Sequence, residues 1–176
     1  MRTLRTALFL SVFLLPGTTC LLPAQTDDSV AMSCRAFVQE FYDWYVPIAL
    51  KQTSEPASNI ALQRRADSFE PELLGLLREE APAEKEAFDA EGPGYDPFLA
   101  SEKPSERFVV KEVRHEGDRC YAEVRGIQAG AETEKVVAEL VFKDGHWFFT
   151  NFHYPPSGDL LSGLQAAHER RSRQQK

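Results

Sequence analysis

The sequence lacks every motif that would indicate a particular chemistry. It contains no glycine-rich loop of the kind that binds phosphate, and no nucleophile elbow. Its four histidines show no short ligand spacing, and Asp89, Glu91 and Asp96 match a calcium loop only loosely, because no matching downstream glutamate follows. We therefore expect no metal and no cofactor. Asp96 better suits an architectural turn in which Phe98 fills the core.

Positive charge is also scarce. Twenty Lys and Arg residues face 27 Asp and Glu residues, which gives a net charge of −7. Nucleic-acid binding requires clustered Lys and Arg side chains that neutralise phosphates, so this composition argues against a nucleic-acid partner. The one basic cluster, residues 170–176, is typical of a solvated helix end.

No apolar run in the sequence is long enough to span a membrane. The run Ala7 to Leu15 follows two arginines and ends at a Pro-Gly pair, which is the pattern of a secretory signal peptide. We expect residues 1–24 to be a signal peptide and residues 25–176 to form a single domain, exported to the periplasm or secreted. Removal of the signal changes the net charge from −7 to −9.

Cysteine occurs three times. Cys20 lies where a lipid-modified cysteine would sit, but the residues before it fit a lipoprotein signal badly, so we expect membrane attachment only if Cys20 is lipidated. Cleavage beyond Cys20 leaves Cys34 and Cys120 as an even pair in an oxidising compartment, which predicts a disulfide. Two buried free thiols are the alternative, since unpaired cysteine is itself a common core residue.

The segment Glu134 to Tyr154 is the clearest structural signal. Two apolar runs flank Asp144-Gly145, a pair suited to a two-residue type I′ hairpin turn. An unbroken pairing sets Ala138 opposite Asn151 and Val136 opposite His153. The face toward the core then consists of Val136, Ala138, Leu140, Phe142, Trp147, Phe149, Asn151 and His153.

The apolar periodicity predicts helices before this hairpin. We expect an amphipathic helix over residues 28–48, a short one within Asn59 to Phe69, and a third that begins at Pro71. The acidic segment Glu79 to Glu106 is interrupted by Pro and Gly, so it is expected to be the tail of the third helix followed by a long loop. A last short helix is expected over Asp159 to His168.

Further strand patterns precede the hairpin. Phe108 to Arg114 and Arg119 to Ile127 are joined by a turn at Glu116-Gly117-Asp118, and Gln128 to Thr133 is expected to connect onward. Helices followed by an antiparallel meander predict an α+β fold, with the N-terminal helices packed on one face of the sheet.

A set of aromatic, turn and glycine motifs is spread along the chain: Phe41 to Tyr45, Asp96 to Leu99, Trp147, Tyr154 and Gly158 to Leu161. Through these motifs the chain resembles an uncharacterised family of bacterial secreted proteins and lipoproteins, a domain of unknown function. The resemblance covers nearly the whole mature chain and implies a curved sheet around helices, a cone of the nuclear-transport-factor-like or cystatin-like kind with a possible pocket. It implies little chemistry, because no activity is established for the group.

The hairpin register suggests where a pocket would lie. Asn151 and His153 are the polar residues of the expected core face, and Tyr42 and Asp43 lie on the aromatic first helix. We expect any ligand pocket to be lined by Asn151 and His153 together with Asp43 or Tyr42. Each residue also has a structural explanation, as a hydrogen-bonded side chain within the fold.

Three hypotheses about function follow. The first is an exported, non-enzymatic binding or interaction domain for a small molecule or an envelope protein. The second is an acid/base enzyme of the cone-fold isomerase or dehydratase type, which uses Asp43 with His153. The third is an inhibitor or immunity protein directed against an envelope hydrolase. Polar groups that converge on one cavity would favour the enzyme, whereas a filled interior would favour an interaction protein.

Overall fold

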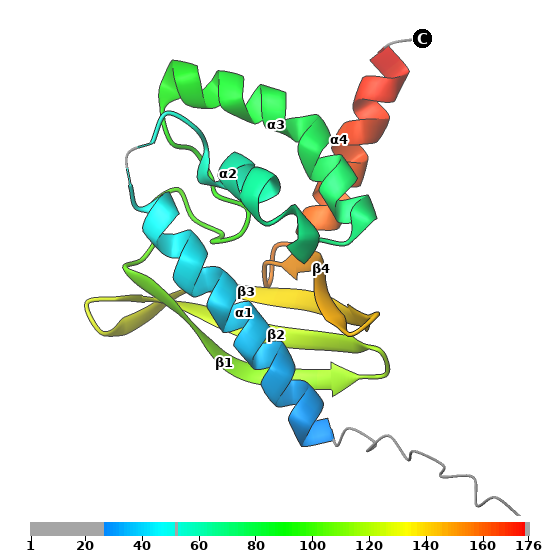
Figure 1. The fold of residues 1–176 in the computed structure, drawn as a ribbon. Helices are drawn as coiled ribbons and strands as arrows, with labels where there is room; N and C mark the ends of the chain where they lie inside the picture. Colours follow the sequence, from blue (N-terminus) through cyan, green and yellow to red (C-terminus); the bar gives the residue numbers. More distant parts are fainter. Residues whose placement is uncertain (1–26, 52, 175–176) are drawn as a thin grey trace, which may run out of the picture.

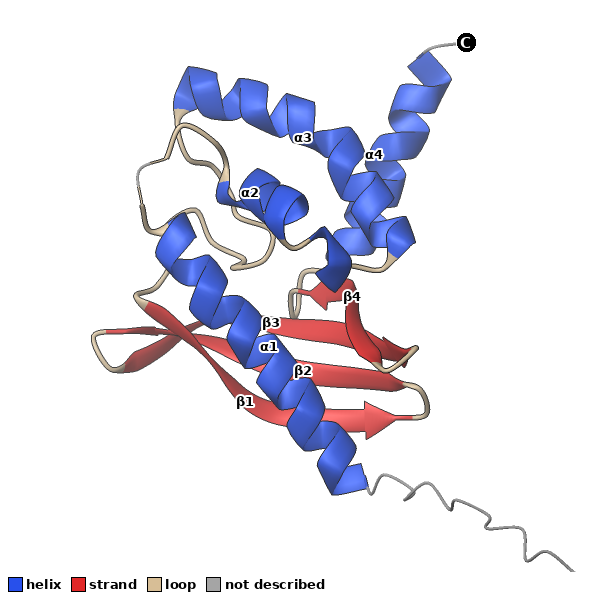
Figure 2. Cartoon of the chain, viewed as in Figure 1, coloured by secondary structure: helices blue, strands red, loops and turns tan. Residues whose placement is uncertain are grey.

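The protein folds as helices packed against an antiparallel sheet, as Figures 1 and 2 show. This computed structural model describes residues 27–51 and 53–174, so the expected signal peptide (1–24) and Cys20 lie outside the described residues. The elements in chain order are α1 (Asp27–Ala49), α2 (Ala57–Arg64), the 3-10 turn η1 (Ala66–Ser68), α3 (Pro71–Glu91), β1 (Arg107–Glu116), β2 (Arg119–Gln128), β3 (Ala131–Lys143), β4 (His146–His153) and α4 (Leu160–Gln174).

The four strands form a meander in the order β1-β2-β3-β4. The predicted turn between β3 and β4 is confirmed: Asp144 and Gly145 both have positive φ, at 53° and 78°, and Lys143 pairs with His146. The turn between β2 and β3 uses the same backbone geometry at Ala129 and Gly130. β3 therefore begins at Ala131. The expected connecting segment Gln128 to Thr133 is instead the end of β2, a two-residue turn and the start of β3.

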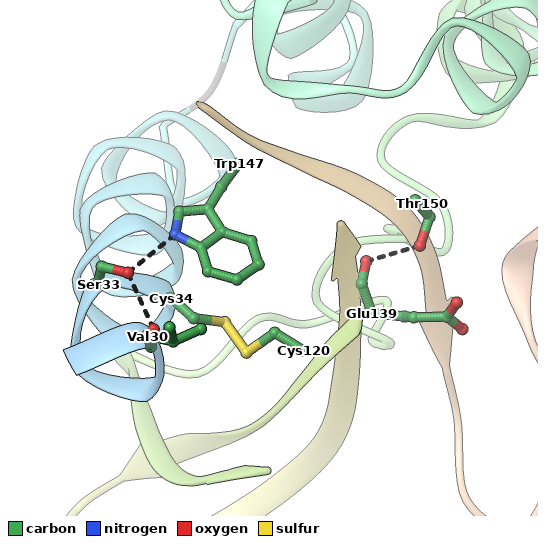
Figure 3. Close-up of a disulfide and its surroundings, with 7 residues drawn as sticks. All are labelled: Val30, Ser33, Cys34, Cys120, Glu139, Trp147 and Thr150. Atoms are coloured by element: carbon green, nitrogen blue, oxygen red, sulfur yellow. Dashed lines mark hydrogen bonds between the residues drawn. A yellow bond between two sulfur atoms is a disulfide. The ribbon is translucent and has the colours of Figure 1, made fainter. Parts of the chain in front are cut away.

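Helix α1 crosses the sheet, and the other helices gather beyond one end of it (Figure 1). The apolar stripe of α1 faces the sheet, as its periodicity predicted. The predicted disulfide is present between Cys34 on α1 and Cys120 on β2, and Trp147 Nε1 donates a 3.2 Å hydrogen bond to Ser33 Oγ beside it (Figure 3). The buried residues of α1 are Cys34, Val38, Phe41, Tyr42, Tyr45 and Val46.

The β1 edge of the sheet is partly covered by α1. Arg35 donates to the carbonyl oxygens of Val110 and Lys111, at 2.6 and 2.9 Å. Gln39 accepts from the Val110 N–H at 2.9 Å and donates to the Phe108 carbonyl at 3.0 Å. Because a bare strand edge is a template for pairing with another chain, these α1 side chains protect the first half of β1.

Helix α3 is longer than the sequence suggested. It continues through Pro82 and ends at Glu91, where Gly92 follows with a φ of 87°. Pro82 removes only one backbone hydrogen bond, and the residues around it are alanine, glutamate and lysine, which favour helix. The irregular segment expected between Glu79 and Glu106 therefore shrinks to residues 92–106.

The register of the β3-β4 hairpin changes partway along. Leu140 pairs with Phe149 as predicted, but Glu139 then pairs with Asn151, so Thr150 is the extra residue of a β-bulge. The Thr150 hydroxyl donates to the Glu139 carbonyl at 3.2 Å (Figure 3). The expected pairs Ala138–Asn151 and Val136–His153 are therefore wrong: Ala138 pairs with Phe152 and Val137 with His153.

The bulge changes which side chains of β4 reach the core. Phe149 and Phe152 are both fully buried, although they are three residues apart and an unbroken strand would point them to opposite faces. Asn151 and His153 move to the Glu139 side of the sheet. Burial of a second phenylalanine accounts for the bulge physically, since each buried phenylalanine side chain contributes about 2 kcal/mol.

Candidate functional site

The space between the helices and the sheet is filled by aromatic rings. Phe41 lies at the centre, with its ring centroid 4.9 Å from that of Phe149 and 5.8 Å from that of Phe98. Phe98 is fully buried, and its own ring lies 5.0 Å from Phe152. The predicted role of Phe98 as a core-filling residue is thus confirmed.

Tyr42 belongs to this packed interior. Its hydroxyl donates a 2.8 Å hydrogen bond to the Phe98 carbonyl, and the side chain is fully buried. Burial raises the pKa of Tyr42 well above its ordinary value, so the phenol stays protonated. Tyr42 therefore ties α1 to the segment 92–106.

Asp43 points away from the interior. It is exposed, and its Oδ1 accepts a 2.8 Å hydrogen bond from Gln39, the same residue that covers the β1 edge. The aromatic neighbours of Asp43 on α1 take the buried positions, so the carboxylate remains in water.

Asn151 is buried and fully engaged. Its amide donates to Asp159 Oδ1 at 2.8 Å, and its oxygen accepts from the N–H groups of Phe152 and Leu161. Asp159 in turn accepts from the Ser162 N–H at the start of α4. Asn151 thus fixes the β4-α4 connection.

His153 lies on the outer face of the sheet, away from α1. Its Nε2 is 2.8 Å from Oε2 of Glu139, a nearly buried carboxylate that also pairs with Arg119. The Tyr121 ring lies beside it, at 6.3 Å between centroids. This arrangement is a cross-strand network on the sheet, in which Glu139 forms an ion pair with Arg119 and a hydrogen bond with His153.

The four residues predicted to line one pocket therefore occupy four different environments. Asp43 is close to β1, because Gln39 donates hydrogen bonds both to Asp43 and to a β1 carbonyl. His153, in contrast, is on β4, the opposite edge strand. The bulge at Thr150 is the physical reason, because it turns Asn151 and His153 away from the face that α1 covers.

A large cleft lies elsewhere among the described residues. It has a volume of about 760 Å³ and lies where the end of α1, the start of α2, the second half of α3 and the segment 92–104 meet. That volume suits a small organic ligand. The residues that line it are Ala49, Lys51, Thr53, Pro56, Ala57, Ser58, Glu84, Ala87, Phe88, Glu91, Gly92, Pro93, Gly94, Tyr95, Asp96, Glu102 and Pro104.

Asp96 forms the floor of this cleft and holds its shape. Its Oδ1 accepts from the N–H groups of Phe98 and Leu99, at 2.9 and 3.1 Å, and its Oδ2 accepts from the Tyr45 hydroxyl at 2.6 Å. Burial raises the pKa of Asp96 to about 6, although these three hydrogen bonds favour the charged form. Asp96 is therefore the architectural turn residue that the sequence predicted.

Glu84 projects from α3 into the wall of the cleft. It accepts a hydrogen bond from the hydroxyl of Ser58, which is itself buried. Burial raises the pKa of Glu84, and the neighbouring carboxylates of Glu55 and Glu80 add to the shift. The cleft thus contains a partly desolvated carboxylate beside a hydroxyl.

The sequence offered one indication of this site. The segment Glu79 to Glu106 stood out as acidic, interrupted by Pro and Gly, and long enough to be functional. Sequence reasoning could not place Glu84 and Asp96 in one cleft. That placement requires α3 to continue beyond Pro82 and the segment after α3 to fold back along it.

The described part of the chain offers neither a metal-ligand cluster nor a membrane-spanning helix. Residues 27–51 and 53–174 contain no group of three or more His, Cys, Asp or Glu side chains placed to hold a metal ion. Asp89, one of the loosely calcium-like acids, is paired with Lys85 on α3. Among the same residues, no helix combines the length and apolarity needed to cross a membrane.

Comparisons with known proteins found no match for this chain: no family model, no curated protein and no solved structure resembles it significantly.

Proposed function

We propose that this protein is an exported, non-enzymatic binding domain whose ligand occupies the cleft between α2, α3 and residues 92–104. The observation that carries the proposal is a contrast in packing. The interior between α1 and the sheet is filled by aromatic rings, whereas the cleft stays open at about 760 Å³. We further propose that the fold belongs with the nuclear-transport-factor-like cones, and that aromatic side chains fill the interior of this cone between α1 and the sheet.

Export is supported by two features of the chain. The disulfide between Cys34 and Cys120 is typical of an oxidising compartment, and the first 24 residues have the pattern of a signal peptide. N-terminal sequencing of the protein from its native host tests this part of the proposal. A mature chain that begins at Met1 contradicts export, and a lipid-modified Cys20 would replace free secretion by membrane anchoring.

The acid/base enzyme is the weaker hypothesis. It requires Asp43 and His153 at one cavity, and they lie at opposite edges of the sheet. The raised pKa of Asp96 is a feature that general bases share. Both Asp96 oxygens, however, already accept hydrogen bonds from protein groups, which favours a structural role.

The experiment uses a set of fragment-sized compounds with equal numbers of cationic, neutral and anionic members, screened by ligand-observed NMR. The test variant is Ala87→Trp, because Ala87 is exposed and lines the cleft, so an indole there fills the site without disturbing the core. The matched control is Ala90→Trp, which lies one turn further along α3, is also exposed, and does not line the cleft.

We expect fragments that bind the wild type to lose binding in Ala87→Trp and to keep it in Ala90→Trp. Binding that survives Ala87→Trp contradicts the proposal, since the ligand would then occupy another surface. A screen in which no fragment binds the wild type contradicts it as well.

A further inference from the structure

The cleft carries an unbalanced charge. Four of its lining residues are acidic, and Lys51 is the single base that lines it. Among the residues that the structure describes, no ion pair joins any of the four acids to a base; these acids are Glu84, Glu91, Asp96 and Glu102.

The acids on the sheet behave differently. Glu123 lies 2.7 Å from Arg125 and 2.5 Å from Lys135, and Glu132 lies 2.9 Å from Lys111. The protein therefore supplies counter-ions for these two sheet carboxylates, whereas the four acids of the cleft have no ion-pair partner among the described residues. A partly desolvated carboxylate without a counter-ion is unfavourable, and an entering cation would relieve that cost.

Much of the rest of the cleft is apolar or aromatic. Phe88, Pro93 and Pro104 form part of its wall, and Tyr95 is about half exposed there (51%). An exposed tyrosine ring attracts a cation through its face, and the proline and phenylalanine surfaces suit an apolar chain or ring. The walls thus complement both halves of an amphipathic amine.

We infer that the cleft binds a small organic cation, an ammonium or guanidinium group carried on an apolar chain or ring, with Glu84 as the carboxylate that pairs with it. This inference rests on the proposed function, because it names the ligand class of the same cleft. A divalent metal ion is a poorer occupant, since the described residues contain no cluster of ligands for one.

The test compares three probes of one shape: 4-phenylbutylamine, 4-phenylbutan-1-ol and 4-phenylbutyrate. Isothermal titration calorimetry is carried out on the wild type and on Glu84→Gln, which keeps the size of the side chain and an acceptor for Ser58. The matched control is Glu86→Gln, since Glu86 is exposed on the same helix and does not line the cleft. Circular dichroism confirms that each variant is folded.

We expect the amine to bind the wild type about tenfold more tightly than the alcohol, the ratio for one charge-assisted hydrogen bond. Glu84→Gln should remove that preference, and Glu86→Gln should keep it. An amine that binds no better than the alcohol, or an equal effect of the two substitutions, overturns the inference.

The two levels of the proposal fail in different ways. If the alcohol or the carboxylate binds best and Ala87→Trp abolishes that binding, the cleft is a ligand site but its ligand is not a cation. If the amine binds and Ala87→Trp leaves it bound, both the inference and the proposed function are wrong.

Discussion

The region formed by the sheet and α1 differs from the cleft beside α3 in whether its polar groups are paired within the protein. On the sheet, Glu139 lies between Arg119 and His153, and the backbone groups at the β1 edge are bonded to Arg35 and Gln39. In the cleft, Glu84 has a hydroxyl partner and no counter-ion among the described residues. Groups satisfied by the protein itself maintain the fold, whereas groups left without a counter-ion mark the place where another molecule can contribute one.

The comparison also separates two kinds of buried polar residue. Tyr42 and Asn151 looked like pocket residues because they are polar and close to the core, but each has its hydrogen bonds completed by the backbone or by Asp159. Burial with complete hydrogen bonding therefore indicates structure, and it is a poor guide to a binding site.

Loss of the disulfide is expected to have the largest effect on the sheet region. Cys34 and Cys120 are 86 residues apart, and a cross-link over such a loop contributes about 4–5 kcal/mol in the chain-entropy model. We expect Cys34→Ala combined with Cys120→Ala to lose a free energy of unfolding of that order, measured by urea denaturation. A loss below about 1 kcal/mol would show that the sheet and α1 hold together without the cross-link.

Asp96 provides a pH-dependent test at the boundary of the two regions. Its folded pKa of about 6 lies above the value of an unfolded aspartate, so the folded state binds the proton more tightly. Ionisation of Asp96 therefore destabilises the folded state at neutral pH. As the pH falls from about 7 to about 4, protonation of Asp96 raises the free energy of unfolding by at most about 3 kcal/mol.

The Asp96→Asn variant removes this titration and keeps an acceptor for the N–H groups of Phe98 and Leu99. We expect it to be more stable than the wild type at neutral pH and to lose that advantage near pH 4, in urea denaturation at a series of pH values. A variant that is less stable by a constant amount at every pH would show that the carboxylate is held in its charged form.

Loss of the α1 contacts that protect the β1 edge is expected to change the assembly state of the protein. Arg35→Ala with Gln39→Ala leaves three carbonyl groups and one N–H group at that edge without their α1 partners. We expect a loss of about 2 kcal/mol and a concentration-dependent self-association detected by analytical ultracentrifugation. The control is Gln63→Ala with Arg64→Ala, two exposed residues of α2, and equal self-association by both pairs would refute edge protection.

A smaller effect is expected at Gly126 on β2. A Cβ at this position would collide with the carboxylate of Glu134 and the hydroxyl of Thr133, which meet the Ser105 hydroxyl there. The ends of these side chains can shift, so we expect Gly126→Ala to cost about 1–2 kcal/mol by loosening the link between the segment 92–106 and the sheet. Thermal unfolding measures it, and an unchanged midpoint would contradict the link.

Much of the sheet region was predictable from local sequence. The turn at Asp144-Gly145 and the apolar stripe of α1 follow from short patterns with a defined geometry. The disulfide between Cys34 and Cys120 was predicted from the even cysteine pair that remains after signal removal, and the structure confirms it. The α+β arrangement followed from the order of these elements along the chain.

The candidate site was not predictable in the same way. The bulge at Thr150 depends on how Phe149 packs against Phe41 of α1 and Phe152 against Phe98, which no local pattern encodes. One extra residue was enough to move Asn151 and His153 to the other face. Likewise, Pro82 within α3 indicated the end of a helix, and only the surrounding helix formers and tertiary packing carry the helix to Glu91.

The central claim is that the cleft, and not the interior beneath the sheet, is where this protein binds its ligand. Titration of ¹⁵N-labelled protein with 4-phenylbutylamine, followed by two-dimensional NMR, tests this directly. The account predicts that amide shifts change at Glu84, Phe88 and Tyr95, which line the cleft. Shift changes centred on Tyr42 and Phe152, with the cleft unaffected, would contradict it.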